Sequence, residues 1–487
     1  MTKYQKIFAS FLLILFMGFA VRMVTSYVVY GPQSVDDYGH GIIPGIEFTE
    51  GKALEIPVWR SPLLVWTLGA ITSVGKFFGI TEMFSLIRFQ LIVLGLFSML
   101  LPFYYFWINR KSLAEDSRYH LIAMSFLSLH CIVVFASTRA FGESIAMTMS
   151  FIALFMMIEA VPKKQYGLLF FGALLMGIAS LYRFQIGVFT IGFLVWLLWK
   201  KEWKSISIFI FAGLISAGLQ AFVDLGVGRW PLQTLYEYIY VNKDGAVEHS
   251  IQPWYNTWIT ALVLMLVPFS LPLFRHVKKL NSTEVLIATL CAFFVLTHSL
   301  IPHKEERFLY PVVPFLLLLL ARLWDFSWNE KFEKWFFRPI AGFILILGFF
   351  IVPISNSQSG EYEPMKFAES LGKPTILWEN DSLLKNSAFY MKLIRPPVDI
   401  KFMGTWPTRD ELMAEIENHD FVFVTSNANL ITSLQEKIDS FGPSVQCAPI
   451  RKIQAPLDTI IYRLNPNQNV RRRPSWLAHC WKQNTAT

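Results

Sequence analysis

Apolar runs long enough to cross a lipid bilayer recur through the first 353 residues of this chain. A helix needs about 20 apolar residues to span roughly 30 Å of hydrocarbon, and runs of that length follow one another from Ile7 to Pro353. Of the 487 residues, 54% are hydrophobic and only 16% are charged. Because soluble domains carry more charge than this, the sequence predicts an all-α polytopic membrane protein.

Lysine and arginine residues cluster on alternate loops between these runs. Short cytoplasmic loops are enriched in positive charge, so the alternation predicts an N-terminus inside and a C-terminus outside. It also accounts for the net charge of +8 without nucleic acid. We expect about eleven spans, at residues 7–29, 86–108, 119–136, 144–161, 166–181, 185–199, 206–223, 257–274, 284–301, 308–322 and 339–353.

The apolar segment from Leu63 to Ile80 is assigned to the membrane interface rather than to a twelfth span. If it crossed the membrane, every later basic cluster would move to the outer face. An interfacial or re-entrant helix keeps the alternation intact.

The character of the sequence changes after residues 1–355. Short alternating apolar and polar blocks predict a small extracytoplasmic α/β domain over 356–465, and residues 466–487 are expected to be a mobile basic tail. Cys447 and Cys480 could form a disulfide, which their spacing alone does not establish. The expected strands are KPTILWEN, DFVFVTSN and DTIIYRL, and the expected helices are TRDELMAEIENH and NLITSLQEKIDSF.

Charged residues gather in the predicted outer loops. Ionisable groups near hydrocarbon are costly, so they usually mark function or bury against partners. Asp36 and Asp37 are adjacent carboxylates that could act as a base, hold a metal or form a solvated turn. We expect one outward-facing cavity to collect these residues together with Glu55, Arg60, Arg139, Glu143, Arg183 and the stretch HKEERF at 303–308.

The stretch HKEERF places five polar residues directly before an apolar span. Lys and Arg complement phosphate, so His303, Lys304 and Arg307 could grip an anionic group. The alternative is a salt-bridged helix cap. Trp254 and Tyr255, in the long loop before residue 257, could belong to an interfacial aromatic belt or stack on sugar rings.

HKEERFLYP resembles the hallmark of the family 22 glycosyltransferases, which are multispanning mannosyltransferases of the GT-C superfamily. VDDY, LEIPVWRSPL, STRAFGES, LYRFQ and HSIQPWYNTW resemble further family segments in the same order, so the resemblance covers about residues 1–338. Val35 stands where the family has Pro, and Asp37 where it has Glu.

The resemblance implies a GT-C fold and inverting transfer of mannose from a polyprenyl (dolichyl) phosphate donor to a lipid-linked glycan or glycolipid, without a cofactor or metal. It implies that Asp36 is the base with Asp37 as its partner, and that Arg60, His303, Lys304 and Arg307 bind the donor phosphate. The residues expected to contact sugar or acceptor are Glu55, Arg139, Glu143, Arg183, Trp254, Tyr255, Glu305 and Glu306.

Two other functions stay open. One is GT-C transfer of a different polyprenyl-phospho-sugar, because a few pocket contacts decide which sugar binds. The other is a transporter or flippase for a lipid-linked glycan, which is disfavoured because paired broken helices are not evident in the two halves. A bacterial inner membrane with a periplasmic site is preferred over an endoplasmic reticulum membrane with a lumenal site.

Overall fold

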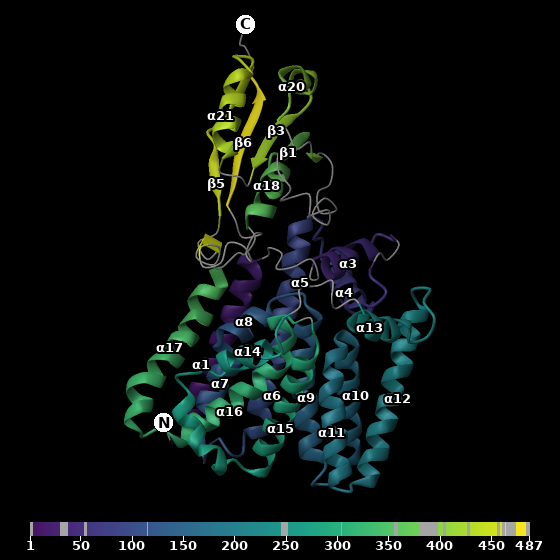
Figure 1. The fold of residues 1–487 in the computed structure, drawn as a ribbon, viewed down its shortest axis with the longest axis vertical. Helices are drawn as coiled ribbons and strands as arrows, with labels where there is room; N and C mark the ends of the chain where they lie inside the picture. The colour runs from purple at the N-terminus through teal and green to yellow at the C-terminus, as the bar shows by residue number, and fades with distance from the viewer. Residues whose placement is uncertain are drawn as a thin grey trace. The chain divides into compact units, whose positions relative to one another are not determined.

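The chain divides into two compact units, which are described separately here (Figure 1). The first comprises Met1–Tyr27 and His40–Pro353, and the second Val28–Gly39 and Ile354–Thr487. The structure is a computed structural model, and it describes residues 3–29, 38–52, 56–113, 115–244, 252–302, 304–354, 359–379, 398–402, 406–425, 429–454, 458–459, 463 and 474–483.

The first unit is a bundle of apolar helices (Figure 1). Among the described residues, seven helical stretches are long and apolar enough to cross a membrane, or eight if α7 and α8, bent by 45°, form one span. The chain is therefore a multi-pass membrane protein, and the count of eleven stays a prediction. The main helices are α1 (Lys3–Val28), α5 (Met83–Ser98), α6 (Leu100–Asn109), α7 (Ser117–Leu129), α8 (Cys131–Ser137), α9 (Gly142–Ala160), α10 (Tyr166–Tyr182), α11 (Gly187–Trp199), α12 (Trp203–Leu225), α15 (Ser282–Leu300), α16 (Val313–Phe326) and α17 (Arg338–Ile346).

Two expected spans are interrupted: that over 119–136 bends between α7 and α8, and that over 257–274 is broken by a turn. The helix α14 (Asn256–Leu264) ends in a turn that contains Pro268, and a 3₁₀ helix, η4 (Leu271–Lys279), follows the turn. Proline has no N–H to donate and its ring clashes with the preceding turn, so an α-helix does not continue through this position unaltered. The prediction of one continuous helix over residues 257–274 is therefore wrong.

The segment assigned to the interface forms α4 (Leu63–Phe77), which packs on the short helix α3 (Ile43–Phe48). The two backbones nearly touch, since a Cβ atom on Gly45 would lie 2.9 Å from the Cβ of Leu68. With 15 residues, α4 is shorter than the roughly 20 residues that a span requires. The expected spans α10 and α11 are also short, with 17 and 13 residues, so the interfacial position of α4 stays a prediction.

A buried arginine ties α1 to the break between α7 and α8. Arg22 is fully buried and donates hydrogen bonds to the carbonyl oxygens of Ser128 (2.6 Å) and Leu127 (3.2 Å) and to Ser98 Oγ (2.9 Å). These carbonyls lie in the last turn of α7, where helix ends leave acceptors without intrahelical partners. Arg22 therefore stabilises the bend that shapes this side of the bundle.

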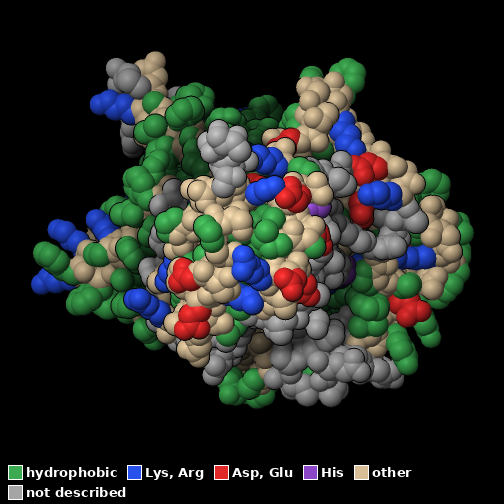
Figure 2. All heavy atoms as spheres, turned by 90° about the horizontal axis from the view of Figure 1, so that it is seen from above, with side chains coloured by type: hydrophobic (Ala, Val, Ile, Leu, Met, Phe, Trp, Pro, Cys, Tyr) green, Lys and Arg blue, Asp and Glu red, His purple; other side chains and the backbone are tan. Residues whose placement is uncertain are grey.

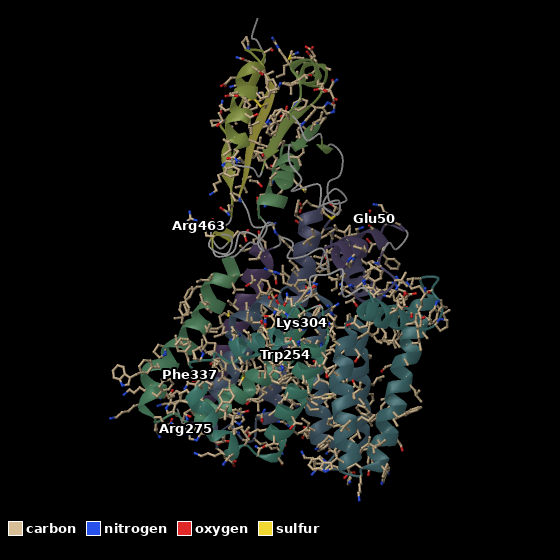
Figure 3. The ribbon with its side chains drawn as sticks, viewed as in Figure 1. Glu50, Trp254, Arg275, Lys304, Phe337 and Arg463 are labelled. Carbon is tan, nitrogen blue, oxygen red and sulfur yellow. A yellow bond between two sulfur atoms is a disulfide. The ribbon has the colours of Figure 1, made fainter. Side chains whose placement is uncertain are left out.

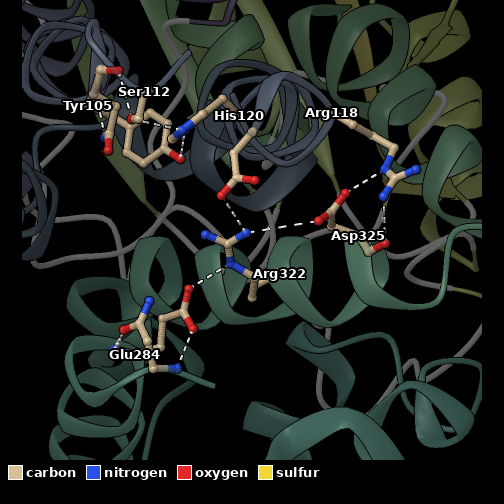
Figure 4. A network of polar contacts seen from close by, with 10 residues as sticks. Tyr105, Ser112, Arg118, His120, Glu284, Arg322 and Asp325 are labelled. Atoms are coloured by element: carbon tan, nitrogen blue, oxygen red, sulfur yellow. Dashed lines mark hydrogen bonds and ion pairs between the residues drawn. The ribbon is translucent and has the colours of Figure 1, made fainter. Parts of the chain in front are cut away.

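Charged side chains lie toward both ends of the bundle. Figure 3 places Arg275 toward one end and Lys304 and Glu50 toward the other. Near the predicted cytoplasmic end, Arg322 of α16 pairs with Glu284 of α15 at 2.6 Å and with Asp116 before α7 at 3.2 Å (Figure 4). These ion pairs fasten three helices together.

The second unit contains a six-stranded sheet in the order β2-β1-β3-β6-β4, with β5 also paired to β6. The strand β1 runs parallel to β2 and β3, whereas β6 runs antiparallel to β3, β4 and β5. The strands are β1 (Thr375–Glu379), β2 (Val398–Phe402), β3 (Asp420–Thr425), β4 (Val445–Cys447), β5 (Arg451–Ile453) and β6 (Ser475–Lys482), and the helices are α18 (Ser359–Ser370), α20 (Arg409–Glu415) and α21 (Leu430–Ser440).

The α/β character and four of the five expected elements of this unit are confirmed, namely β1, β3, α20 and α21. The stretch DTIIYRL is not the expected strand at its described residues, because Asp458, Thr459 and Arg463 are helical. Ser475–Lys482 is not a mobile tail but forms β6. The structure pairs Cys447 of β4 with Cys480 of β6 in a disulfide between register partners.

Acidic and basic side chains are interspersed on the molecular face seen in Figure 2, rather than gathered into a block of one sign. Nucleic-acid binding calls for a concentrated basic patch or stripe. On this face, therefore, the net positive charge does not make such a surface.

Candidate active site

Three residues predicted for the outer cavity come together in the first unit. Glu143 lies in the first turn of α9, Arg183 follows the end of α10, and Arg307 lies in the 3₁₀ helix η5 (Glu306–Val312). These elements meet because α9 packs against both α10 and η5. The fold therefore joins STRAFGES, LYRFQ and HKEERF at one place.

Glu143 is the centre of this cluster. Its Oε1 lies 2.6 Å from Nη2 of Arg183 and 3.8 Å from Nε of Arg307. Arg307 Nε also lies 2.5 Å from Glu305 Oε2. The side chains of Glu143 and Arg183 are only 3% and 7% exposed, so water screens their charges weakly.

Aromatic rings border the two guanidinium groups. The guanidinium of Arg183 lies 5.1 Å from the ring centre of Phe308, and that of Arg307 lies 5.4 Å from the ring centre of Phe141. Arg139, also buried, donates to the Thr138 carbonyl at 3.1 Å and lies over a ring of α8. Cations over aromatic faces are held electrostatically, and the rings limit access of water.

Lys304 is held beside this cluster by backbone oxygens. Its Nζ donates to the carbonyls of Ile301 at 2.5 Å and Gln252 at 3.2 Å. Burial lowers the pKa of the Lys304 ammonium from its ordinary value. An ammonium has three N–H donors, so one remains for a ligand beyond these two carbonyls.

A small pocket lined mainly by polar residues adjoins Lys304, and it contains a residue that no motif of the sequence singles out. His298 of α15 lines this pocket together with Lys304, Glu305 and Glu306. Its Nδ1 lies 2.8 Å from the Phe294 carbonyl, while Nε2 has no hydrogen-bond partner among the residues that the structure describes. The feature of the sequence that could have pointed to His298 is its position, within two helical turns before HKEERF.

Arg229 positions the segment 56–61, which carries Arg60. Its Nη1 donates to the carbonyls of Arg60 (2.9 Å) and Val58 (3.1 Å), and its Nη2 to that of Ile56 (3.3 Å). On α13 (Gln233–Asp244), the charges of Arg60, Arg183 and Glu143 all act on the Tyr238 hydroxyl. The place of Arg60 in the site stays a prediction.

Replacing Arg229 by Met is expected to loosen residues 56–61. Hydrogen bonds to charged donors contribute about 1.5–3 kcal/mol each. Without them, the backbone amides of residues 56–61 should exchange with solvent at least tenfold faster than in the unmodified protein. Hydrogen–deuterium exchange with mass spectrometry checks this. Arg110→Met is the control, because Arg110 is exposed and donates to the Trp107 carbonyl within its own helix region. Equal exchange in the two variants would refute the role of Arg229.

The other predicted residues are not gathered into the buried cluster. Trp254 and Tyr255 are 65% and 48% exposed, and neither lines the pocket beside Lys304. Glu306 lines that pocket and is itself exposed. Asp36, Asp37, Glu55 and His303 lie outside the described residues.

The cluster has the chemistry of an anion site. The four cations of these segments, Arg139, Arg183, Lys304 and Arg307, outnumber the three carboxylates of Glu143, Glu305 and Glu306. Preformed cations in a water-poor site stabilise negative charge that develops on a leaving group. Across the part of the chain that the structure describes, no group of three or more His, Cys, Asp or Glu side chains could hold a metal.

Solved structures with a similar fold are two crystal structures of ArnT from Cupriavidus metallidurans. The one bound to undecaprenyl phosphate has a TM-score of 0.59 and 12% identity, over 98% of each chain. The apo structure has a TM-score of 0.58 and 12% identity, over 96% of this chain and 97% of the other. This likeness concerns the fold, and it confirms the GT-C architecture.

Curated relatives match over shorter segments. GPI mannosyltransferase 4 of Eremothecium gossypii is 26% identical over 146 residues, which are 29% of this chain and 28% of that protein. GPI mannosyltransferase 3 of Candida albicans is 37% identical over 90 residues, 18% of each chain. The matches therefore span less than a third of these relatives. The model of the Alg9-like mannosyltransferase family matches residues 58–374, well over half of the sequence, and the chain belongs to that family.

Proposed function

We propose that this protein is an integral-membrane, inverting mannosyltransferase that uses a polyprenyl (dolichyl) phosphate mannose donor and a lipid-linked glycan or glycolipid acceptor. The observation that carries the proposal is the buried cluster in which Glu143 holds Arg183 and Arg307. A cationic site beside a membrane-embedded bundle suits a phosphate attached to a prenyl chain. ArnT, which shares the fold, has been crystallised with undecaprenyl phosphate.

In the proposed reaction, an acceptor hydroxyl oxygen attacks C1 of mannose as the bond from C1 to the phosphate oxygen breaks. The proton of that hydroxyl passes to Asp36, with Asp37 beside it as partner. Polyprenyl phosphate leaves with its electron pair, and Arg60, His303, Lys304 and Arg307 stabilise its growing charge. Glu305 and Glu306 orient sugar hydroxyls, and the proposed site faces the periplasm of a bacterial inner membrane.

A direct assay tests this proposal. The purified full chain in nanodiscs is mixed with radiolabelled decaprenyl-phosphate mannose and a total lipid extract from cells that lack the protein. The expected result is a labelled glycolipid whose mass is larger by one hexose, together with free decaprenyl phosphate. Donors that carry glucose, arabinose or an amino sugar are run in parallel. Transfer of another sugar alone would refute mannose as the substrate, and lipid movement without a new glycosidic bond would indicate a transporter.

A further inference from the structure

A lateral cavity of about 670 Å³ lies between the helices α9, α11 and α15. Its volume is in the range of roughly 300–1,000 Å³ that ligand pockets occupy. Apolar side chains such as Ile158, Leu286 and Leu290 form most of its wall. It shares no residue with the pocket beside Lys304, so it is a separate site.

The one charged group of this cavity and two of its hydroxyls lie at one end, while the Thr289 hydroxyl farther along α15 donates to the carbonyl of Val285. The helix α11 ends next to Lys200, and α15 begins at Ser282, so the two helices bring Lys200, Ser282 and Thr283 to the same mouth. At the other end, a Cβ atom on Gly192 would lie 2.8 Å from Leu290 Cδ2, so the two helices close the cavity there. Eight residues of helix separate the two ends on each wall, or about 12 Å.

A cavity that is charged at its mouth and has a mostly apolar wall for about 12 Å inward has the polarity of a lipid molecule. We propose that it binds one anionic phospholipid, with an acyl chain along Leu286 and Leu290 and the headgroup phosphate beside Lys200 and the hydroxyls of Ser282 and Thr283. Trp199 is 76% exposed next to Lys200, as expected of an interfacial aromatic residue.

The position of the mouth separates this lipid from a donor at the candidate active site. Ser282 follows η4, which contains Arg275, and Figure 3 shows Arg275 toward the opposite end of the bundle from Lys304. A phosphate beside Lys200 would therefore belong to the leaflet with the basic loops and to a different molecule. The carboxylate of Glu284, on another side of α15, is paired with Arg322 at 2.6 Å, which limits its repulsion of an anion.

Native mass spectrometry of the full chain in detergent tests the proposal. Phosphatidylglycerol and phosphatidylcholine with identical acyl chains are titrated separately into delipidated protein. We expect one phosphatidylglycerol to be retained under conditions that remove phosphatidylcholine. Lys200→Glu should weaken that retention about fivefold or more, since one basic residue near an anionic lipid accounts for such a factor. Equal retention of both lipids by the unmodified protein would overturn the proposal.

Matched variants locate the site. Thr289, exposed on α15, lines the cavity and bonds to the carbonyl four residues before it, as Thr297 does outside the cavity. Thr289→Trp should obstruct the cavity along α15 and abolish retention, whereas Thr297→Trp and the exposed-loop variant Lys111→Glu should retain lipid. Two results would contradict the assignment. One is retention of phosphatidylglycerol by Thr289→Trp, and the other is displacement of phosphatidylglycerol from the unmodified protein by decaprenyl phosphate.

Discussion

Replacing Glu143 by Gln is expected to lower the free energy of unfolding by about 3–5 kcal/mol, because the change leaves buried guanidinium groups without their carboxylate. Arg183 loses its 2.6 Å partner, and Arg307 loses one of its two acidic neighbours. We also expect mannose transfer to disappear, since the cationic side chains would no longer be held in place. Unfolding by sodium dodecyl sulfate in mixed micelles measures the stability.

Glu159→Gln is the matched control for this prediction. Glu159 lies in the same helix α9, but its side chain is 40% exposed and pairs at 2.7 Å with Lys163 at the surface. Surface ion pairs contribute about 0–1 kcal/mol, so this variant should remain close to the unmodified protein. If the two variants lost equal stability, the central role of Glu143 would be wrong.

Replacing Asp36 by Asn is expected to reduce the turnover number about 10²–10⁴-fold, the usual contribution of a general base. The Michaelis constant for the donor should change little, because the proposed phosphate ligands are untouched. Steady-state kinetics with decaprenyl-phosphate mannose separates these two quantities. Asp36 lies outside the described residues and before the residues 58–374 that the family model matches, so its role rests on the resemblance of VDDY to a segment of the family.

Asp439→Asn controls for the loss of one carboxylate. Asp439 is exposed on α21 and accepts a hydrogen bond from Gln435. It should leave turnover unchanged. A rise in the Michaelis constant of Asp36→Asn without a fall in turnover would place Asp36 among binding residues and count against the assignment as base.

The composition of the candidate site was predictable, but its pairing was not. Buried ions beside hydrocarbon are costly, so Arg139, Glu143, Arg183 and Arg307 were expected to meet. Which cation pairs with which carboxylate depends on how α9, α10 and η5 pack against one another. No local sequence pattern encodes this packing. His298 was missed because a histidine within an apolar helix has the same local pattern whether it packs or binds.

The errors in the fold have similar physical causes. Proline is tolerated in membrane helices when neighbours satisfy the freed carbonyls, so Pro268 alone did not reveal the turn after α14. The strand β6 follows a run of three arginines, and that charge made the whole stretch look like a solvated tail. Its burial becomes visible only once β3 and β4 flank it.

The position of β6 sets an order of events during biosynthesis. It is translated after β1, β3, β4 and β5, yet it lies between β3 and β4 and carries Cys480, the partner of Cys447. Until residues 475–482 have been synthesised, one edge of β3 has no partner strand and the Cys447 thiol has no Cys480 with which to form the disulfide. Closure of the sheet should therefore be a late step, completed only after its last strand has been synthesised.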